Sequence, residues 1–321
     1  MKKLSIVIAA LLLAGTACER DGVYNPKKKI SEIYDESSRS VVYQDYPEAN
    51  YTYTNPKSLS SSWTWDKNLL TKITYDVDDY AEFKYNGKRL STVILWDYGL
   101  TLTYVYNGSK IDKINVIMGW DGMTGTYAYT YKGNKVSQID IIMNYVNDGY
   151  IDDDFKTKSF AKINQLALPA VVCDMLAQTE NKMKQKSTKA TTRTVTVDFE
   201  WSGDNVSKIK LIQKYEDLIL FTATSTCTYD NKLNPFYHSP MFFGELFDTG
   251  SFSKNNLTKV VSTSKYAWED EVETTETNYT YYYDGKFPVK QISESTEVWY
   301  SEYYGTTVTS KRNQVTYFVY K

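Results

Sequence analysis

The sequence predicts an all-β protein: a large antiparallel β-meander closed into a barrel or near-barrel, with a short helical insert. A two-layer β-sandwich is the alternative. Three observations predict this fold class. A hairpin motif recurs along the chain, apolar and polar residues alternate on both sides of it, and the motifs follow one another too closely for helical crossovers.

The hairpin motif consists of an aromatic residue, an apolar residue five positions later and an aliphatic residue three positions beyond that. Turn formers such as "NGKR", "NGSK" and "KGNK" lie between the first two, because Asn, Asp and Gly tolerate the positive φ that a tight reversal demands. Two looser copies, around Tyr229 and Tyr283, place the apolar residue one position early, at Leu233 and Phe287. The full copies are Trp65, Leu70 and Ile73; Tyr85, Leu90 and Val93; Tyr106, Ile111 and Ile114; Tyr131, Val136 and Ile139; Trp201, Val206 and Ile209; and Phe252, Leu257 and Val260.

Alternation and spacing indicate how the hairpins are joined. In "TVTVDFEW", Val195, Val197 and Phe199 share one face, and polar residues share the other. From Trp65 to Tyr131 the motifs follow at intervals of 20, 21 and 25 residues, so the strands must pair antiparallel. About 14 to 18 strands exceed the usual size of an open twisted sheet, which should therefore close. The apolar residues after each turn are three apart, which predicts a β-bulge or a twisted turn.

The segment 150–192 interrupts the meander. It carries apolar residues at the spacing of one helical face, with Pro169 suited to the first turn. We expect this helix to pack as a lid on the outside of the barrel, and a plug or cap of the barrel is the alternative. Cys173 and Cys227 either form a disulfide or act as two separate buried thiols. The apolar helical positions are Leu168, Val171, Val172, Met175 and Leu176.

The N-terminus has the layout of a secretory signal peptide, with two lysines, an apolar run and small residues before Cys18. The stretch "LLLAGTAC" resembles a bacterial lipobox, although Gly15 stands where Leu is usual. We therefore expect residues 1–17 to be removed, Cys18 to carry acyl chains that hold the protein at a membrane, and residues 18–62 to tether a barrel-like domain at 63–321. Loss of Lys2 and Lys3 moves the net charge from −2 to −4, which predicts no nucleic-acid partner.

The chain resembles a family of Bacteroidetes-type envelope lipoproteins, grouped as a domain of unknown function with a porin-like fold and built from tandem Tyr-Asp-type β-hairpins. The resemblance rests on the lipobox, on hairpins of the type "YTYKGNKVSQI", and on "CTYDNKLNPFY" followed by "SKNNLTKV". It covers about residues 63–321. It implies a lipoprotein anchored in the outer membrane, on its periplasmic side or at the cell surface, and the family offers no catalytic residues to carry over.

Residue types needed for several chemistries are scarce or wrongly spaced. The single histidine, His238, has no nucleophile motif to act with, and the cysteines lack zinc-site spacing. No glycine-rich phosphate loop is present, and we expect no metal, cofactor or catalytic residue. The acidic stretches "NDGYIDDDF" and "WEDEVE" are interpreted as solvated surface. Two carboxyl groups suffice for glycoside hydrolysis, so a carboxylate-dependent glycosidase remains a weaker alternative.

The hairpin ends opposite the glycine turns collect aromatic rings and carboxylates. Because antiparallel hairpins of similar length return equivalent positions to one end of the sheet, we expect these residues to form one rim that binds a saccharide or peptide. The alternative is that the rings only close the end of the core. The candidate ligand-binding residues are Trp96, Asp97, Trp120, Asp121, Tyr145, Tyr215, Tyr266 and Trp268.

The function expected from these observations is that of a non-catalytic binding protein, anchored in the outer membrane, for a glycan, a peptide or another envelope ligand. A structural module that docks on another envelope protein is the alternative. A barrel embedded in lipid is disfavoured, since Ser262 and Ser264 lie on the same strand face as Val260 where a lipid-facing band should be apolar.

Overall fold

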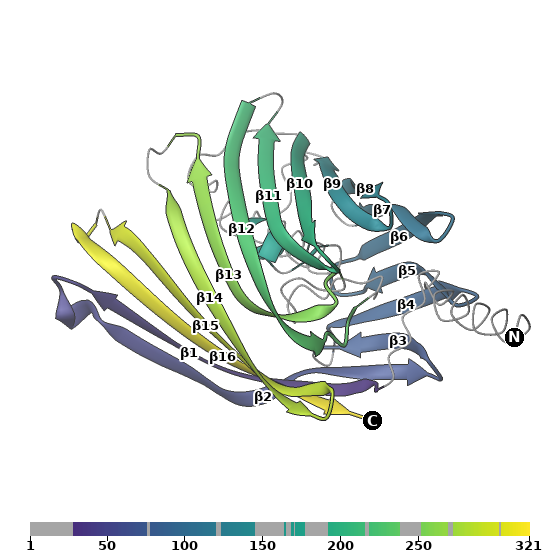
Figure 1. Ribbon diagram of the computed structural model, residues 1–321, viewed down its shortest axis with the longest axis horizontal. Coiled ribbons are helices and arrows are strands. Elements are labelled where there is room, and N and C mark those ends of the chain that lie inside the picture. Colours follow the sequence, from purple (N-terminus) through teal and green to yellow (C-terminus); the bar gives the residue numbers. More distant parts are fainter. Residues whose placement is uncertain are drawn as a thin grey trace, which may run out of the picture.

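The computed structural model describes residues 28–75, 78–119, 123–144, 164, 168–169, 171–176, 192–215, 218–237, 252–268, 272–301 and 303–321. They form a closed barrel of sixteen antiparallel strands in which β1 pairs with β16 (Figure 1). The predicted closed meander is confirmed. The strands are β1 Ile30–Tyr43, β2 Tyr51–Asp66, β3 Leu69–Thr74, β4 Tyr80–Asn86, β5 Arg89–Leu95, β6 Leu100–Asn107, β7 Lys110–Met118, β8 Thr124–Lys132, β9 Lys135–Asn144, β10 Thr192–Ser202, β11 Asn205–Tyr215, β12 Leu218–Leu233, β13 Asn255–Tyr266, β14 Glu273–Asp284, β15 Phe287–Ser301 and β16 Thr306–Tyr320.

The first two strands correct the expected domain boundary. Residues 18–62 were expected to be a tether, yet β1 and most of β2 lie between Ile30 and residue 62 and complete the barrel. A 3-10 turn at Pro47–Ala49 lies between them. This stretch is rich in Ser, Thr and charged residues, and it is a strand because its backbone groups pair with β16 and within the β1–β2 hairpin. Cys18 lies outside the described residues.

Each full copy of the motif that lies in one hairpin builds a two-residue turn followed by a β-bulge. In the β4–β5 hairpin Tyr85 pairs with Leu90 while Lys84 pairs with Thr92, so Ser91 is the extra residue. The bulge returns Leu90 and Val93, three apart in sequence, to the same buried face, and both are 0% exposed. The same register shift occurs before Trp65, Tyr106, Tyr131 and Trp201.

The bulge carries a hydroxyl group that the sequence analysis did not single out. Ser91 Oγ donates a hydrogen bond of 3.0 Å to the carbonyl oxygen of Lys84, across the strand pair. Residues six positions after the motif aromatic repeat this bond in three other hairpins, at Thr71, Ser137 and Ser207. A Ser or Thr at this position was therefore a readable signal of the bulge.

The motif aromatics join neighbouring hairpins through their polar tips. The β5–β6 ladder ends at Thr92 and Thr103, so the carbonyl of Leu90 lies beyond it, and Tyr106 Oη donates to this oxygen at 2.8 Å. Equivalent bonds run from Tyr85 to Leu70 and from Tyr131 to Ile111. We call this set of bonds the aromatic seam, which also contains Trp65 Nε1 to Ile30 O, Trp201 Nε1 to Val136 O and Tyr320 Oη to Pro288 O.

The tight turns lie at one end of the barrel, called here the turn end, together with the strand ends Leu233 and Asn255 that the β12–β13 connection joins. The other connections lie at the loop end. The first turn residue has positive φ in each tight hairpin, for example 62° at Gly87, as a two-residue reversal requires. The β2–β3 hairpin has Lys67 at this position, with φ of 51° and no glycine. Strand β1 begins and strand β16 ends at the turn end, where Lys29 and Lys321 exchange two backbone hydrogen bonds.

The described residues of the helical insert, 164, 168–169 and 171–176, lie inside the barrel, which corrects the expected outer lid. Residues 171–176 are helical, and Figure 1 shows this helix within the ring of strands. Tyr127, on the buried face of β8, donates a 2.7 Å hydrogen bond to Asn164 Oδ1. The inner faces of β3 to β13 are apolar and the outer faces polar, so an apolar helix finds its partner only inside. The side chains of Leu168, Val171, Val172, Met175 and Leu176 are all nearly inaccessible to solvent.

Cys173 of the insert and Cys227 of β12 are each half-buried against the core and form no disulfide with one another. Across the part of the chain that the structure describes, no helix has the length and apolar character needed to cross a membrane.

Candidate functional site

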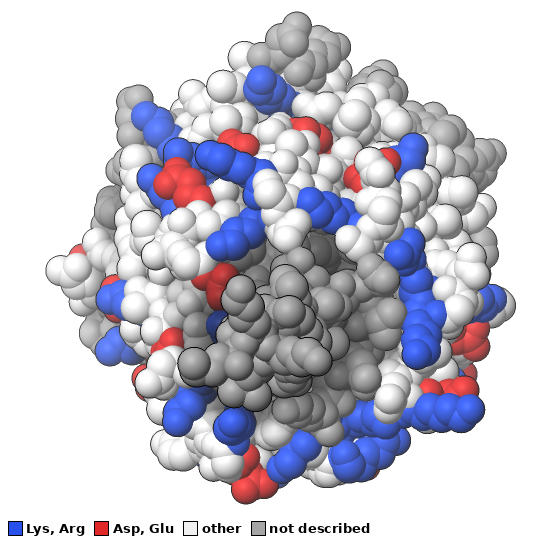
Figure 2. Space-filling model, turned by 45° about the vertical axis from the view of Figure 1, so that its right-hand side comes forward, with Lys and Arg blue, Asp and Glu red and all other residues white. Residues whose placement is uncertain are grey.

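The outer face of the barrel carries charges in the middle of strands. Glu200 of β10 and Lys210 of β11 form a 2.8 Å ion pair, and Lys259 of β13 and Glu276 of β14 form one of 2.7 Å. Figure 2 shows charged side chains of both signs distributed over the visible surface. A lipid-facing band would be a continuous apolar surface about 25 Å tall, and the described outer face is not of this kind.

The inner face differs between the two halves of the barrel. The half from β3 to β13 is mainly apolar and packs on the helix, and the polar side chains of Arg193, Gln213, Ser225 and Ser264 are also buried there. On β14, β15, β16, β1 and the first part of β2 the inward positions follow from the register, because residues directly opposite share a face. Ile33 and Phe318 are paired core residues, and alternation from them assigns the other positions. We call the resulting surface the polar inner wall: Asp35, Ser37, Arg39, Tyr53, Asn55, Thr275, Thr277, Gln291, Ser293, Ser295, Glu297, Ser310, Arg312, Gln314 and Thr316.

Two arginines lie directly opposite one another on the polar inner wall. Arg39 of β1 pairs in register with Arg312 of β16, and like charges in this relation are destabilising. Arg39 is held by a 2.8 Å hydrogen bond from its Nε to Ser310 Oγ and by a 3.9 Å contact of Nη2 with Glu297 Oε2. The side chain of Arg39 is 35% exposed and that of Glu297 is 49% exposed, so both are accessible.

Asp174 presents a carboxyl group from the inner helix to this wall. Enclosure by the protein raises the pKa of Asp174 to about 6, Arg312 counteracts the rise, and the negative charge of Glu297 adds to it. The side chain of Asp174 nevertheless keeps accessible surface, unlike its apolar helical neighbours. The arrangement therefore combines two guanidinium groups, the carboxyl groups of Asp35, Glu297 and Asp174, and several hydroxyls on one inward-facing surface. No cluster of His, Cys, Asp or Glu suited to a metal ion occurs among the described residues.

The predicted rim residues that the structure describes all lie at the loop end. Trp96 and Asp97 follow β5 and are exposed, with the Trp96 ring 6.5 Å from that of Tyr80. Tyr215 ends β11. Trp120, Asp121 and Tyr145 lie outside the described residues.

Tyr266 and Trp268 come together after β13, with ring centroids 5.3 Å apart. Tyr266 is only 1% exposed and packs against Phe221 at 4.9 Å, so it offers almost no surface to a ligand. Trp268 is 37% exposed and reaches solvent. The rim therefore combines at least one ring that closes the core with rings that are accessible.

A second aromatic group at the loop end was missed by the sequence analysis. The connections β1–β2 and β15–β16 bring together Tyr43, Tyr46, Tyr303 and Tyr304, with centroid distances of 4.7 to 5.6 Å to the Tyr304 ring. We call these four residues the tyrosine tip. Tyr303 is 89% exposed. The only sequence signal was the density of tyrosines in "VVYQDYP" and "SEYYG", which lie far apart in the chain.

No family model matches the chain, and no curated protein sequence matches it. Among solved structures, the chain is similar to a porin-like protein from Bacteroides vulgatus, with 9% sequence identity, a TM-score of 0.37, and coverage of 92% of this chain and 99% of that one. It is also similar to OmpT, an outer membrane protein of Vibrio cholerae, with 6% identity, a TM-score of 0.21, and coverage of 91% and 99%. We transfer no residue role from either protein.

Proposed function

We propose that this protein is a non-catalytic binding protein, anchored in the outer membrane through lipid on Cys18, that holds a polar ligand against the polar inner wall. The observation that carries the proposal is the division of the barrel interior into an apolar half and a polar half. An apolar inner face on all strands would suffice to stabilise the fold. The polar groups on these five adjacent strands keep solvent access, with Tyr53 48% exposed and the Glu297 side chain 49% exposed, so a ligand that enters the barrel can replace their water partners.

The chemistry of the wall suits a glycan or a peptide. Hydroxyl, amide and guanidinium groups supply donors and acceptors at fixed spacing along the strands, and Tyr53, opposite Arg39, supplies a ring that can stack on a sugar face. Tyr53 is 48% exposed. Arg39 and Arg312 can bind an acidic sugar or a peptide carboxylate, and the carboxyl groups of Glu297 and Asp174 can accept hydrogen bonds from hydroxyl or ammonium groups of the same ligand.

The charged outer face supports a barrel that is held at the membrane by its lipid and is not embedded in it. Replacement of Cys18 with Ser should release the protein from the membrane fraction. A variant that stays bound after a carbonate wash contradicts lipid anchoring.

The binding proposal is tested with a library of glycans and muropeptides against wild type and three variants. The wall variant is Arg312→Ala with Tyr53→Ala, the rim variant is Trp96→Ala, and the matched outer-face control is Lys113→Ala with Tyr282→Ala. We expect the wall variant to lose affinity at least tenfold while the control, equally folded by circular dichroism, keeps it. A ligand that binds the wall variant as well as wild type refutes the wall, and a loss confined to the rim variant moves the site to the loop-end rim.

Two other functions are each favoured by one observation. The carboxyl groups of Asp174 and Glu297 interact and the pKa of Asp174 is raised to about 6, as a general acid in a glycosidase requires. Release of reducing sugar in the same library, abolished by Glu297→Gln, would establish that function.

The exposed tyrosine tip favours docking on another envelope protein. Tyr303→Ala should then abolish capture of that protein and leave ligand binding unchanged.

A further inference from the structure

The turn end of the barrel carries a concentration of positive charge that contrasts with the net charge of −2 of the whole chain. Twelve basic residues lie in the described turns or at the adjoining strand ends, against four acidic ones, Asp66, Asp204, Asp230 and Asp284. Figure 2 brings this end toward the viewer, and blue side chains encircle the centre of the view. We call the twelve residues the basic ring: Lys28, Lys29, Lys67, Lys88, Arg89, Lys110, Lys132, Lys135, Lys232, Lys254, Lys286 and Lys321.

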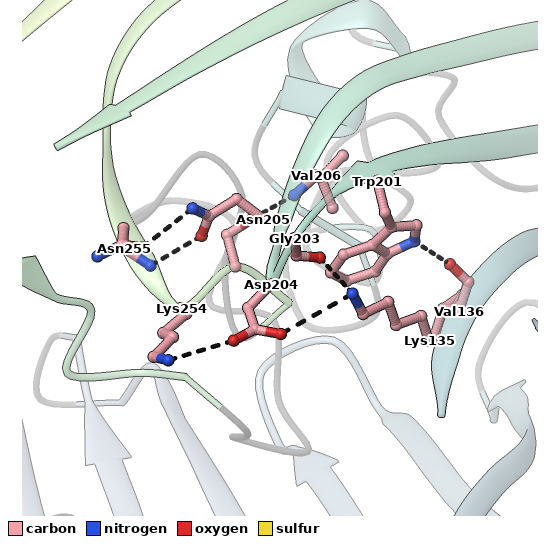
Figure 3. A network of polar contacts seen from close by, with 10 residues as sticks. Lys135, Val136, Trp201, Gly203, Asp204, Asn205, Val206, Lys254 and Asn255 are labelled. Carbon is pink, nitrogen blue, oxygen red and sulfur yellow. Dashed lines mark hydrogen bonds and ion pairs between the residues drawn. The ribbon is translucent and has the colours of Figure 1, made fainter. Parts of the chain in front are cut away.

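The acidic residues at this end compensate only part of the ring. Asp204 lies between two lysines, 3.8 Å from Lys135 and 3.2 Å from Lys254 (Figure 3), and Asp284 pairs with Lys28 at 3.0 Å. These contacts use two of the four acidic side chains for three of the bases.

The lysines in the turns themselves are not compensated in this way. Lys67, Lys88, Lys132 and Lys286 are exposed and make no ion pair with any described residue. They lie in or beside the turns of four different hairpins. Their ammonium groups are therefore spread around the turn end and are available to an anionic surface.

The place where the chain enters the barrel relates this end to the membrane. Lys28 and Lys29 lie at the turn end, fixed through Asp284 and Lys321. Only residues 19–27 separate Lys28 from Cys18. A chain of this length spans at most about 35 Å, so lipid on Cys18 would keep the turn end, rather than the loop end, close to the bilayer. In this one respect the inference rests on the proposed function.

We propose that the basic ring docks on the phosphate groups of an anionic lipid surface and so orients the barrel with its loop end away from the membrane. Each Lys close to an anionic bilayer contributes about fivefold to the partition coefficient, and the contribution falls off within a Debye length of about 8 to 10 Å. The polar inner wall and the rim would then open toward the compartment from which the ligand arrives.

The experiment measures binding to vesicles without the lipid anchor. Because every strand of the described barrel lies after residue 28, residues 18–321 with Cys18→Ser are used. The probe is sedimentation with vesicles containing 30% phosphatidylglycerol, compared with pure phosphatidylcholine. The ring variant carries Lys67→Gln, Lys88→Gln, Lys132→Gln and Lys286→Gln. The control variant carries four matching changes on strands and far from the turn end, Lys57→Gln, Lys214→Gln, Lys265→Gln and Lys311→Gln, so both variants have the same net charge.

We expect the parent protein to bind the anionic vesicles and release them in 0.5 M salt. The ring variant should bind at least tenfold more weakly, and the control variant within about twofold of the parent. Equal losses in the two variants, or equal binding to the two kinds of vesicle, overturn the proposal. Inhibition by 10 mM inorganic phosphate, with the same ring dependence, assigns the ring to free phosphate and also overturns it. These outcomes do not depend on lipidation of Cys18, which the fractionation experiment tests separately.

Discussion

Replacement of Tyr106 with Phe removes one oxygen atom from the aromatic seam and leaves the ring in place. The oxygen lost is the one that donates at 2.8 Å to the carbonyl of Leu90, beyond the end of the β5–β6 ladder. Leu90 is 0% exposed, and Tyr106 is packed against the core. The carbonyl would therefore lose its partner in a place with restricted access to solvent, which costs about 1 to 2 kcal/mol of unfolding free energy.

The assay is urea unfolding followed by circular dichroism, with Tyr282→Phe as the matched control. The Tyr282 ring is 52% exposed and faces outward, so loss of its hydroxyl should change the free energy by less than about 0.5 kcal/mol. The triple variant Tyr85→Phe, Tyr106→Phe and Tyr131→Phe should lose about 3 to 6 kcal/mol, because the three bonds belong to different hairpin pairs and should add.

The larger change Tyr106→Ala separates packing from hydrogen bonding. It should cost about 3 to 5 kcal/mol, whereas Lys88→Ala in the turn should have little effect. If Tyr106→Phe and Tyr282→Phe both match wild type while Tyr106→Ala is costly, the motif rings act by packing alone and the seam bonds do not contribute.

Three further results are expected. Lys67→Gly should raise the unfolding free energy by about 0.5 to 1 kcal/mol, because relief of a φ of 51° outweighs the added chain entropy, and Gly87→Ala should lower it; a loss in Lys67→Gly contradicts this. The pKa of Asp174 is about 6, above the ordinary value near 3.9, so its neutral form stabilises the fold below about pH 4 and this contribution is lost as pH rises through 6. Asp174→Asn should therefore be more stable than wild type by about 1 kcal/mol at pH 7.5, a figure discounted for solvent contact, with no difference at pH 4; equal stability at both refutes it. Burial raises the pKa of Tyr106 to about 12, so stability should fall as pH rises from 10 to 12, less steeply in Tyr106→Phe; parallel pH curves contradict this.

The half of the barrel from β3 to β13 was readable from the sequence because its two faces differ. Inward positions such as Val195, Val197 and Phe199 are buried. The residues that alternate with them, such as Asp198 and Glu200, face solvent. This contrast produces the period-two pattern from which the hairpins and the closed sheet were predicted. The spacing of three between apolar residues was also a true signal, because it predicted a β-bulge or a twisted turn and the structure has the bulge.

The strands β1 and β2 gave no such pattern. Ser37, Arg39 and Asn55 face inward and Glu36 and Ser38 face outward, so both faces are polar. A polar stretch of this kind has the composition of a linker, and only its pairing with β16 makes it a strand. The same property hid the polar inner wall, since Arg39 and Arg312 become neighbours only when the barrel closes.

The position of the helix was undetermined for a different reason. The sequence showed an apolar helical face, which must be buried, but both an outer and an inner location would bury it. The choice depends on which face of the strands is apolar, and alternation alone does not reveal which face turns inward. Once Val197 and Ile209 are known to face inward, the apolar residues of the helix have a partner only inside the barrel.

The basic residues of the turn end divide into two groups with separable effects. Arg89, Lys110 and Lys135 each lie over the motif aromatic of the next hairpin, at 4.8, 5.1 and 5.3 Å from the ring centroid. Each of these three basic residues directly precedes the residue whose carbonyl oxygen accepts the bond of the aromatic seam. Replacing one of them removes a positive charge and also a cation–π contact worth about 0.5 to 1 kcal/mol.

The turn lysines Lys88, Lys132 and Lys286 have no such role in the described structure. Their removal should lower membrane docking and leave the unfolding free energy unchanged, whereas removal of Arg89, Lys110 or Lys135 should lower both. Charge alone would make the two groups equivalent in vesicle binding. The seam makes them differ in stability, and for this reason the ring variant contains only lysines that the seam does not use.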